Sequence, residues 1–257
     1  MTQTERLIFL INYLQNEKYG LKSIDIPAQD TARKRLLRSL MNIRPPKPVS
    51  KEFLEVQDAY LQEECMEKGI ISLSGIPSAG PGIYLWQGDI TRLSVDAIVN
   101  AANSAMLGCF VPCHGCIDNA IHSAAGVELR LECSRIMEEQ KTEEPVGKAK
   151  ITKAYNLPCR YILHTVGPII HGTVTRQDQN LLSDCYRSCL ELAAACQLKS
   201  IAFCCISTGE FHFPNEKAAE IAIQTVQRYQ KENQNSLEVV FNVFKDSDYQ
   251  IYKRLLG

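Results

Sequence analysis

The sequence predicts an α/β protein with a largely parallel sheet covered by helices on both faces and preceded by a helical extension. From about residue 71, strand-like runs alternate with helical patterns, which is typical of βαβ units. Residues 1–70 instead carry helical patterns and little strand signal. We therefore expect an N-terminal helical extension over 1–70 and an α/β domain over 71–257.

The extension reads as a series of helices. Apolar residues recur at helical spacing over 6–14, in a helix expected to end near Gly20. A second helix is predicted over 31–43, prolines between 45 and 48 break the pattern, and a third helix follows over 53–68. The lysines and arginines here predict a solvated helical surface. The apolar surface is small for a unit that folds without the rest of the chain.

The α/β part alternates strands and helices along its length. Predicted strands cover residues 83–86, 97–100, 161–165, 200–206 and 237–244, with a weaker candidate over 149–155. Predicted helices cover residues 116–139, 179–196, 215–231 and 248–256. Sites in such sheets lie beyond the carboxyl ends of strands, where loops lead into helices. Two loops in such positions carry candidate chemistry.

Composition limits the class of protein. With a net charge of -1, the chain lacks the strong basic field of a general nucleic-acid binder. No apolar run reaches the length of a membrane span, and the first residues lack a secretory signal, so we expect a cytoplasmic protein. The eleven cysteines are odd in number and scattered, which argues against a disulfide framework.

The first loop, after the strand at 97–100, gathers potential metal ligands. Cys109, Cys113, His114 and Cys116 lie within eight residues, and thiolates with imidazole are what zinc prefers. Three ligands with an open position would make a catalytic site, and four would make a closed structural site. Any single cysteine is more typical of core packing than of a metal ligand, but three cysteines and a histidine this close together favour a metal site.

The second loop, Ser207 to Pro214, is rich in small residues. Serine and glycine let backbone N–H groups approach a phosphate, and the helix that follows adds a favourable dipole. Such loops are also common connectors, so this loop alone identifies no ligand.

Taken together, the two loops and their flanking motifs resemble the macrodomain family, whose members bind ADP-ribose. The resemblance runs from about Tyr84 to Leu256, and it is carried by Gly88–Thr91, Val95–Ser104, Ala120–Gly126, His164–Pro168 and Ser207–Gly209. It implies a three-layer α/β/α fold with a mixed, largely parallel sheet. Where most macrodomains have glycines, this chain has its cysteine-rich segment. That departure, like the helical extension, resembles the zinc-containing, sirtuin-linked bacterial branch of protein-ADP-ribose hydrolases.

The resemblance also implies a role for each matching residue. One Zn²⁺ would be held by Cys109, His114 and Cys116, leaving Cys113 as a spare thiol, and Asn103 would complete the catalytic group. The ADP-ribose contacts implied are Asp89 and Ile90 at the adenine, Asn103 at the distal ribose, Ile117, Asp118 and Asn119 along the phosphate and ribose path, and Ser207, Thr208, Gly209, Glu210 and Phe211 around the diphosphate.

Each of these residues also has a structural interpretation. Asp118 could simply favour a helix N-terminus, Asn103 could form a turn, and Phe211 could be ordinary packing. Other residues are expected to be structural: Cys185, Cys189 and Cys196 in the core, Cys204 and Cys205 on opposite faces of a strand, and His122 and His164 in internal hydrogen bonds. The role of His212 stays open.

The sequence and its resemblance together predict a zinc-dependent hydrolase that removes mono-ADP-ribose from an acidic side chain of a modified protein. The favoured substrate is a lipoyl-carrier protein, which the resemblance alone suggests. The main alternative is a non-catalytic ADP-ribose reader in which zinc braces the loop. A redox-controlled thiol site is a second alternative. Nucleic-acid binding ranks lowest, and no membrane partner is expected.

Overall fold

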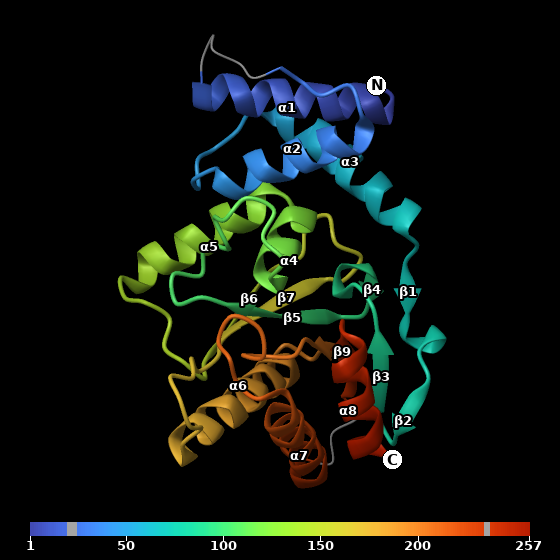
Figure 1. Ribbon diagram of the computed structural model, residues 1–257, viewed down its shortest axis with the longest axis vertical. Helices are drawn as coiled ribbons and strands as arrows, with labels where there is room; N and C mark the ends of the chain where they lie inside the picture. The colour runs from blue at the N-terminus through green and yellow to red at the C-terminus, as the bar shows by residue number, and fades with distance from the viewer. Residues whose placement is uncertain (20–24, 234–236) are drawn as a thin grey trace.

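The computed structural model of the protein describes residues 1–19, 25–233 and 237–257 (Figure 1). Its N-terminal part holds helices α1 (Gln3–Tyr19), α2 (Asp30–Ile43) and α3 (Lys51–Lys68), where the sequence predicts three helices. Ser50 begins α3 by accepting a hydrogen bond from the Phe53 N–H at 3.1 Å. The predicted helix end at Gly20 lies outside the described residues.

The three helices share an apolar cluster of their own, separate from the core around the sheet. Its members are Leu7, Leu10, Ile11, Leu14, Leu37, Leu40, Met41, Phe53, Tyr60 and, from the sheet-bearing part, Val127. The single contribution from outside the extension shows where the two parts join. Polar contacts, described below, make up the rest of that junction.

The central sheet has the strand order β2-β3-β9-β8-β5-β7-β6 among the described residues. Its strands are β2 (Ser78–Gly80), β3 (Ile83–Gln87), β5 (Ala97–Ala102), β6 (Ala149–Lys153), β7 (Tyr161–Val166), β8 (Ser200–Phe203) and β9 (Glu238–Val243). The edge strands β2 and β6 pair antiparallel, and the pairs between them are parallel. The expected mixed, largely parallel sheet is therefore confirmed. A short parallel pair outside it joins β1 (Ile71–Ser72) to β4 (Leu93–Ser94).

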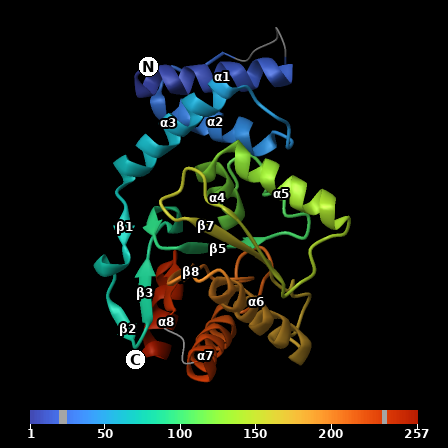
Figure 2. The ribbon, with the colours of Figure 1, turned by 180° about the vertical axis from the view of Figure 1, so that it is seen from behind.

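Helices cover both faces of this sheet. On one face lie α4 (Ile117–Ala125) and α5 (Val127–Gln140), with the N-terminal helices stacked beyond them. On the other face lie α6 (Arg176–Ala195), α7 (Asn215–Asn233) and α8 (Asp246–Leu256), as both views show (Figures 1 and 2). The α/β/α layering agrees with the sequence. No helix among the described residues is long and apolar enough to cross a membrane.

Three local expectations need correction. The helix predicted over 116–139 is broken at Gly126, where φ is +100°, a conformation that glycine adopts readily. The strand predicted over 200–206 ends at Phe203, so Cys204 and Cys205 follow the strand and do not belong to it. Cys185 and Cys189 are buried as expected, but Cys196 is exposed just after α6.

Candidate functional site

The two candidate loops follow neighbouring strands and lead to helices on opposite faces of the sheet. The cysteine loop (residues 103–116) runs from β5 into α4 on one face of the sheet, and the Ser207 loop (residues 204–214) runs from β8 into α7 on the other. Because β5 and β8 are paired and parallel, both loops begin at the same edge of the sheet. A parallel sheet forms its ligand crevice at such a switch point.

The cysteine loop brings three potential metal ligands together. The ligand atoms of Cys109, His114 and Cys116 all lie within 4.8 Å of one another, and all three side chains are half-buried. Cys109 Sγ is 3.7 Å from His114 Nδ1. Burial raises the pKa of the Cys116 thiol to about 12, so its thiolate needs a cation beside it. Two sulfurs and an imidazole nitrogen this close fit a soft or borderline divalent metal ion.

Cys113 faces away from that cluster. Its thiol donates to the Arg35 carbonyl of α2 at 3.3 Å, and its backbone N–H donates to Asn42 Oδ1 at 2.8 Å. Its φ is +52°, in the left-handed region, so the chain turns sharply between the ligands. The described geometry therefore offers three protein ligands, and the Cys113 thiol is directed to the extension.

Side chains of α2 and α4 hold the middle of the cysteine loop. Asn119, 0% exposed, donates from Nδ2 to the Val111 carbonyl at 3.0 Å. Its Oδ1 accepts from Arg38 at 3.0 and 2.7 Å, and Arg38 Nη2 also donates to the His114 carbonyl at 3.0 Å. The Asn119 side chain thus braces the loop from the start of α4. Arg38 also departs from the solvated surface expected of the extension's basic residues.

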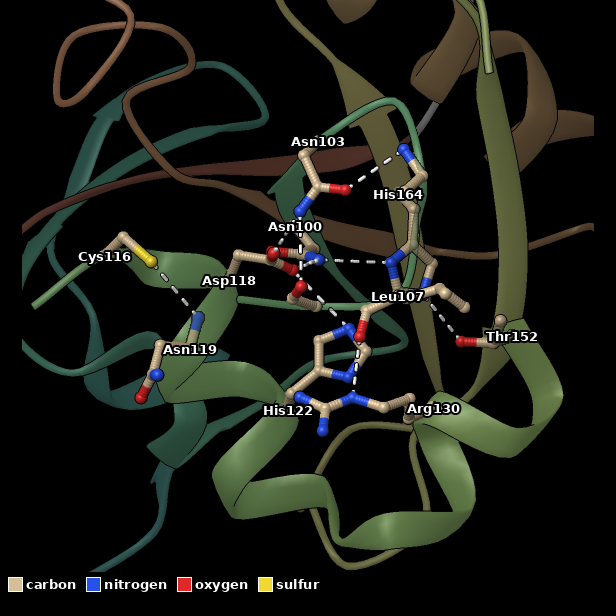
Figure 3. Close-up of polar contacts among 12 residues, drawn as sticks. Asn100, Asn103, Leu107, Cys116, Asp118, Asn119, His122, Arg130, Thr152 and His164 are labelled. Carbon is tan, nitrogen blue, oxygen red and sulfur yellow. Dashed lines mark hydrogen bonds and ion pairs between the residues drawn. The ribbon is translucent and has the colours of Figure 1, made fainter. Parts of the chain in front are cut away.

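A buried polar cluster forms the floor beneath the cysteine loop (Figure 3). Asp118 accepts hydrogen bonds from Asn100 Nδ2 at 2.8 Å and from Asn103 Nδ2 at 3.4 Å, and its burial raises its pKa to about 6. His164 contacts Asn100 Nδ2 at 3.2 Å and Thr152 Oγ1 at 2.9 Å through its two ring nitrogens. The internal hydrogen bonds expected of His164 are therefore confirmed, and burial lowers its pKa to about 3.

His122 and Asn103 lie beside this buried cluster and differ in their hydrogen bonding. His122 is fully enclosed, and its ring nitrogens have no hydrogen-bond partner among the described residues; Nε2 lies 3.5 Å from Asp118 Oδ1. The internal hydrogen bonds expected of His122 are thus absent from this part of the chain. Asn103 accepts from the Ala105 N–H at 3.1 Å and donates to the Gly108 carbonyl at 3.3 Å, so it shapes the start of the loop.

The Ser207 loop is shaped by its own backbone. Ser207 has a φ of +65°, and its carbonyl accepts from the Phe213 N–H at 2.9 Å, while the Gly209 carbonyl accepts from the His212 N–H at 3.0 Å. Among the described residues, the amides of Gly209, Glu210 and Phe211 have no partner within the protein. Consecutive free N–H groups of this kind form an anion-binding concavity.

The two loops meet through one ion-pair contact. Glu210 Oε1 of the Ser207 loop lies 3.5 Å from His114 Nε2 of the cysteine loop. The opposite ring nitrogen of His114, Nδ1, faces Cys109. Glu210 therefore contacts the side of the imidazole that is turned away from the sulfur, and the cluster of potential metal ligands is a neighbour of the Ser207 loop in space.

The adenine-side candidates lie after β3. Asp89 accepts from the Thr91 N–H at 3.0 Å and from the Thr91 hydroxyl at 2.7 Å, both at Oδ1. Within the described chain, Oδ2 is left for a ligand. The Ile90 side chain is 1% exposed and belongs to the core. Ile117 and Phe211 are half-buried at the start of α4 and in the Ser207 loop, where they can border a ligand.

Comparison with known proteins identifies the fold family. Residues 99–222 match the Macro domain family. A protein-ADP-ribose hydrolase of Treponema medium is 56% identical over 100% of both chains. The protein belongs to the macrodomain family. Solved neighbours agree: this macrodomain is 41% identical to the Oceanobacillus iheyensis macrodomain with ADP, with a TM-score of 0.62 over 68% of this chain and 89% of that chain.

A second solved structure extends the likeness beyond the sheet. The Trypanosoma brucei macrodomain in complex with ADP-ribose is 29% identical, with a TM-score of 0.67 over 85% of this macrodomain and 95% of that chain. The first of these neighbours is bound to ADP and the second to ADP-ribose.

Sequence reasoning missed three residues that organise this macrodomain's site. Arg38 and Asn42 contact the cysteine loop from α2, and Arg130 of α5 donates from Nε to the Leu107 carbonyl at 2.7 Å. Arg130 Nη1 also donates to the carbonyls of Met41, Asn42 and Arg44 at the end of α2. The contacts made to and from α2 join segments more than 70 residues apart, so no local pattern could have shown them.

Proposed function

We propose that the protein is a zinc-dependent protein-ADP-ribose hydrolase that removes mono-ADP-ribose from an acidic side chain of a modified protein. The names of its relatives support hydrolysis, since the 56% identical Treponema protein and a 50% identical Staphylococcus aureus protein are both called protein-ADP-ribose hydrolase. The reducing conditions of the cytoplasm would keep Cys109 and Cys116 available as ligands.

One observation carries the proposal. The Cys109, His114 and Cys116 cluster lies beside the free amides of the Ser207 loop, with His114 Nε2 only 3.5 Å from Glu210. A diphosphate bound on those amides would direct the attached distal ribose toward neighbouring groups. Cys109, His114 and Cys116, which would hold the metal, lie next to this loop.

The chain's own groups divide the work of binding. The N–H groups of Gly209, Glu210 and Phe211 would bind the diphosphate, as anion-binding concavities do. The free Oδ2 of Asp89 would accept the exocyclic amine proton of adenine, which selects the base. Asn103, at the start of the cysteine loop, would orient the distal ribose. Half-buried Phe211 would pack against that ribose and exclude water from one side.

The chemical demand falls on orientation more than on acid catalysis. A carboxylate leaving group has a pKa of about 4, so it departs from the anomeric carbon without strong proton donation. When bound, zinc supplies Lewis acidity and one coordination position that three protein ligands leave open. The two thiolates reduce the effective charge of such a site, so positioning by His114, Asn103 and Glu210 matters correspondingly more.

The testing experiment measures ADP-ribose release from a protein modified on Asp or Glu, beside the zinc content of the enzyme. We expect release to fall when a chelator removes zinc and to return when zinc is added. Tight ADP-ribose binding without release would establish a reader in place of the hydrolase. If zinc-free Cys109→Ala and His114→Ala proteins kept full turnover, the proposed zinc dependence would be wrong and the proposed hydrolase activity would stand.

The favoured substrate is a mono-ADP-ribosylated lipoyl-carrier protein. Only the sequence resemblance supports this choice, so it needs its own comparison. Initial rates on the modified carrier and on an unrelated protein carrying the same acidic-linked ADP-ribose would decide it. Equal rates would show that the enzyme recognises ADP-ribose alone.

A further inference from the structure

The N-terminal helices do more than cover the α/β part, because their polar contacts converge on the cysteine loop. Asn42 of α2, 1% exposed, accepts from the Cys113 N–H at 2.8 Å and donates to Ser123 Oγ at 2.9 Å. Arg38, one turn earlier, donates to the His114 carbonyl and to Asn119 Oδ1. Both residues therefore reach the loop between its first and last metal-ligand candidates.

These contacts form a chain that ends at the ligands themselves. Arg38 fixes the Asn119 amide, and Asn119 in turn holds the Val111 carbonyl through Nδ2 at 3.0 Å. The backbone N–H of Asn119 donates to Cys116 Sγ at 3.4 Å. The Ser123 hydroxyl, contacted by Asn42, donates to the Asn119 carbonyl at 2.6 Å. The segment from Val111 to Cys116 thus takes its shape from two side chains of α2.

Two features of the loop make contacts from outside important to its shape. Cys113 has a φ of +52°, a left-handed conformation that costs a non-glycine residue free energy. Phe110 and Val111 at its outer edge are 41% and 55% exposed, so little burial fixes them. The hydrogen bonds to Cys113 N–H and the His114 carbonyl flank the strained residue on both sides.

We infer that the helical extension is part of the metal site, with Arg38 and Asn42 of α2 as positioning residues that keep Cys109, His114 and Cys116 in a ligand-presenting arrangement. This inference rests on the metal assignment of the proposed function. Groups that orient metal ligands from outside the coordination sphere typically change metal affinity by about 10- to 100-fold when removed. The extension would therefore set how long the enzyme keeps its metal.

The test follows zinc release from the full-length protein after addition of excess chelator with a chromogenic indicator. Arg38→Met keeps the aliphatic bulk and removes the donors, and Asn42→Ala removes the acceptor for Cys113. We expect zinc release at least about tenfold faster in both variants. Arg38→Lys has one donor nitrogen in place of a planar guanidinium, so its rate of zinc release should lie between those of Arg38→Met and the wild type.

Arg35→Met is the matched control. Arg35 lies on the same helix one turn before Arg38, its side chain is exposed, and the change keeps the carbonyl that contacts Cys113. Its zinc-release rate should equal that of the wild type. A second readout separates positioning from general stability: the rise in Tm on adding zinc should shrink in Arg38→Met and stay unchanged in Arg35→Met.

The outcomes separate this inference from the proposed function. Wild-type zinc-release rates in folded Arg38→Met and Asn42→Ala proteins would overturn it, as would an equal loss of Tm with and without zinc. If Arg38→Met does not fold, Arg38→Lys and Asn42→Ala decide. A wild type that binds zinc but releases no ADP-ribose would end the hydrolase proposal and leave this inference standing. A wild type that binds no zinc would overturn both the inference and the metal assignment.

Discussion

The cysteine loop and the Ser207 loop leave neighbouring strands of one sheet, and the protein holds them by different means. The cysteine loop is held by side chains from outside, including Arg38, Asn42 and Asn119. The Ser207 loop is held chiefly by hydrogen bonds to its main chain, one of them from the Ile170 N–H to the Phe211 carbonyl, and it presents free amides to solvent. One loop displays side chains as ligands, and the other displays main-chain donors.

This difference implies that the two loops tolerate substitution differently. A loop that works through its backbone keeps its donors whatever side chain is replaced, provided that the left-handed φ at Ser207 is preserved. A loop that works through oriented side chains depends on every residue that orients them. Metal binding and ADP-ribose binding should therefore be separable by mutation.

The largest expected effect comes from removing a metal ligand. Cys109→Ala should lose zinc and reduce ADP-ribose release by more than about 100-fold, because losses outside the coordination sphere alone reach that size. Its affinity for ADP-ribose should stay within about threefold of the wild type, since the amides of the Ser207 loop remain. Calorimetric titration beside a zinc assay checks both. A joint collapse of zinc and ADP-ribose binding would show that the loops form one unit.

Glu210→Gln tests the one contact that joins the loops. The change removes the negative charge 3.5 Å from His114 Nε2 and keeps the backbone N–H of residue 210. We expect zinc release to quicken about tenfold while ADP-ribose affinity is retained. Glu216→Gln, which alters an exposed carboxylate paired with Arg254, is the control. If ADP-ribose affinity changed and zinc release did not, Glu210 would belong to the ligand pocket only.

The floor beneath the cysteine loop predicts a dependence of stability on pH. Burial lowers the pKa of His164 to about 3, so the unfolded state binds a proton that the folded state does not. Stability is then fully present above the unfolded pKa and falls as the pH drops, by up to about 2 kcal/mol between about pH 6.5 and about pH 5. Denaturant unfolding of the wild type and His164→Gln compares the slopes. If the unfolding free energies of the two proteins change equally with pH, His164 does not contribute to the pH dependence of stability.

The smallest expected effect serves as a control for both loops. Thr175 begins α6 in a reciprocal pair of hydrogen bonds with Asp178, on the face of the sheet opposite α4. Thr175→Ala should cost about 1 kcal/mol of unfolding free energy. Zinc content and ADP-ribose affinity should not change, and thermal unfolding measured beside both assays checks this. A shift in either binding assay would mean that general stability, and not local positioning, controls the site.

The sequence predicts the layered fold and the metal cluster because both depend on residue type and spacing. Cys109, His114 and Cys116 are close in the chain, so a short turn suffices to bring them together. Gly126 shows the limit of such reasoning, because a lone glycine inside a helical pattern is often tolerated. In the structure Gly126 has a φ of +100°, and the Gln57 amide lies where a Cβ would project, so two features disfavour any other residue at this break.

The contacts between α2 and the cysteine loop could not be predicted from the sequence for another reason. Arg38 has the sequence context of an exposed helical arginine, and its partners Asn119 and His114 come more than 70 positions later. The family resemblance assigns Asn119 to the ligand path, whereas in the structure its side chain is hydrogen-bonded to Arg38 of α2. Long-range polar contacts of this kind leave no periodic trace in a sequence.

The contacts of the Arg130 guanidinium matter for any attempt to transplant the α/β part into another protein. It donates hydrogen bonds to the carbonyls of Met41, Asn42 and Arg44. Gln57 Oε1 accepts a hydrogen bond from the Val127 N–H at 2.9 Å. A fragment cut at residue 71, where the first strand β1 begins, would leave Arg130 Nη1 and the Val127 N–H without these partners. The unit to transplant is therefore the extension and the α/β part together, and a graft that contained only the α/β part would lack these partners.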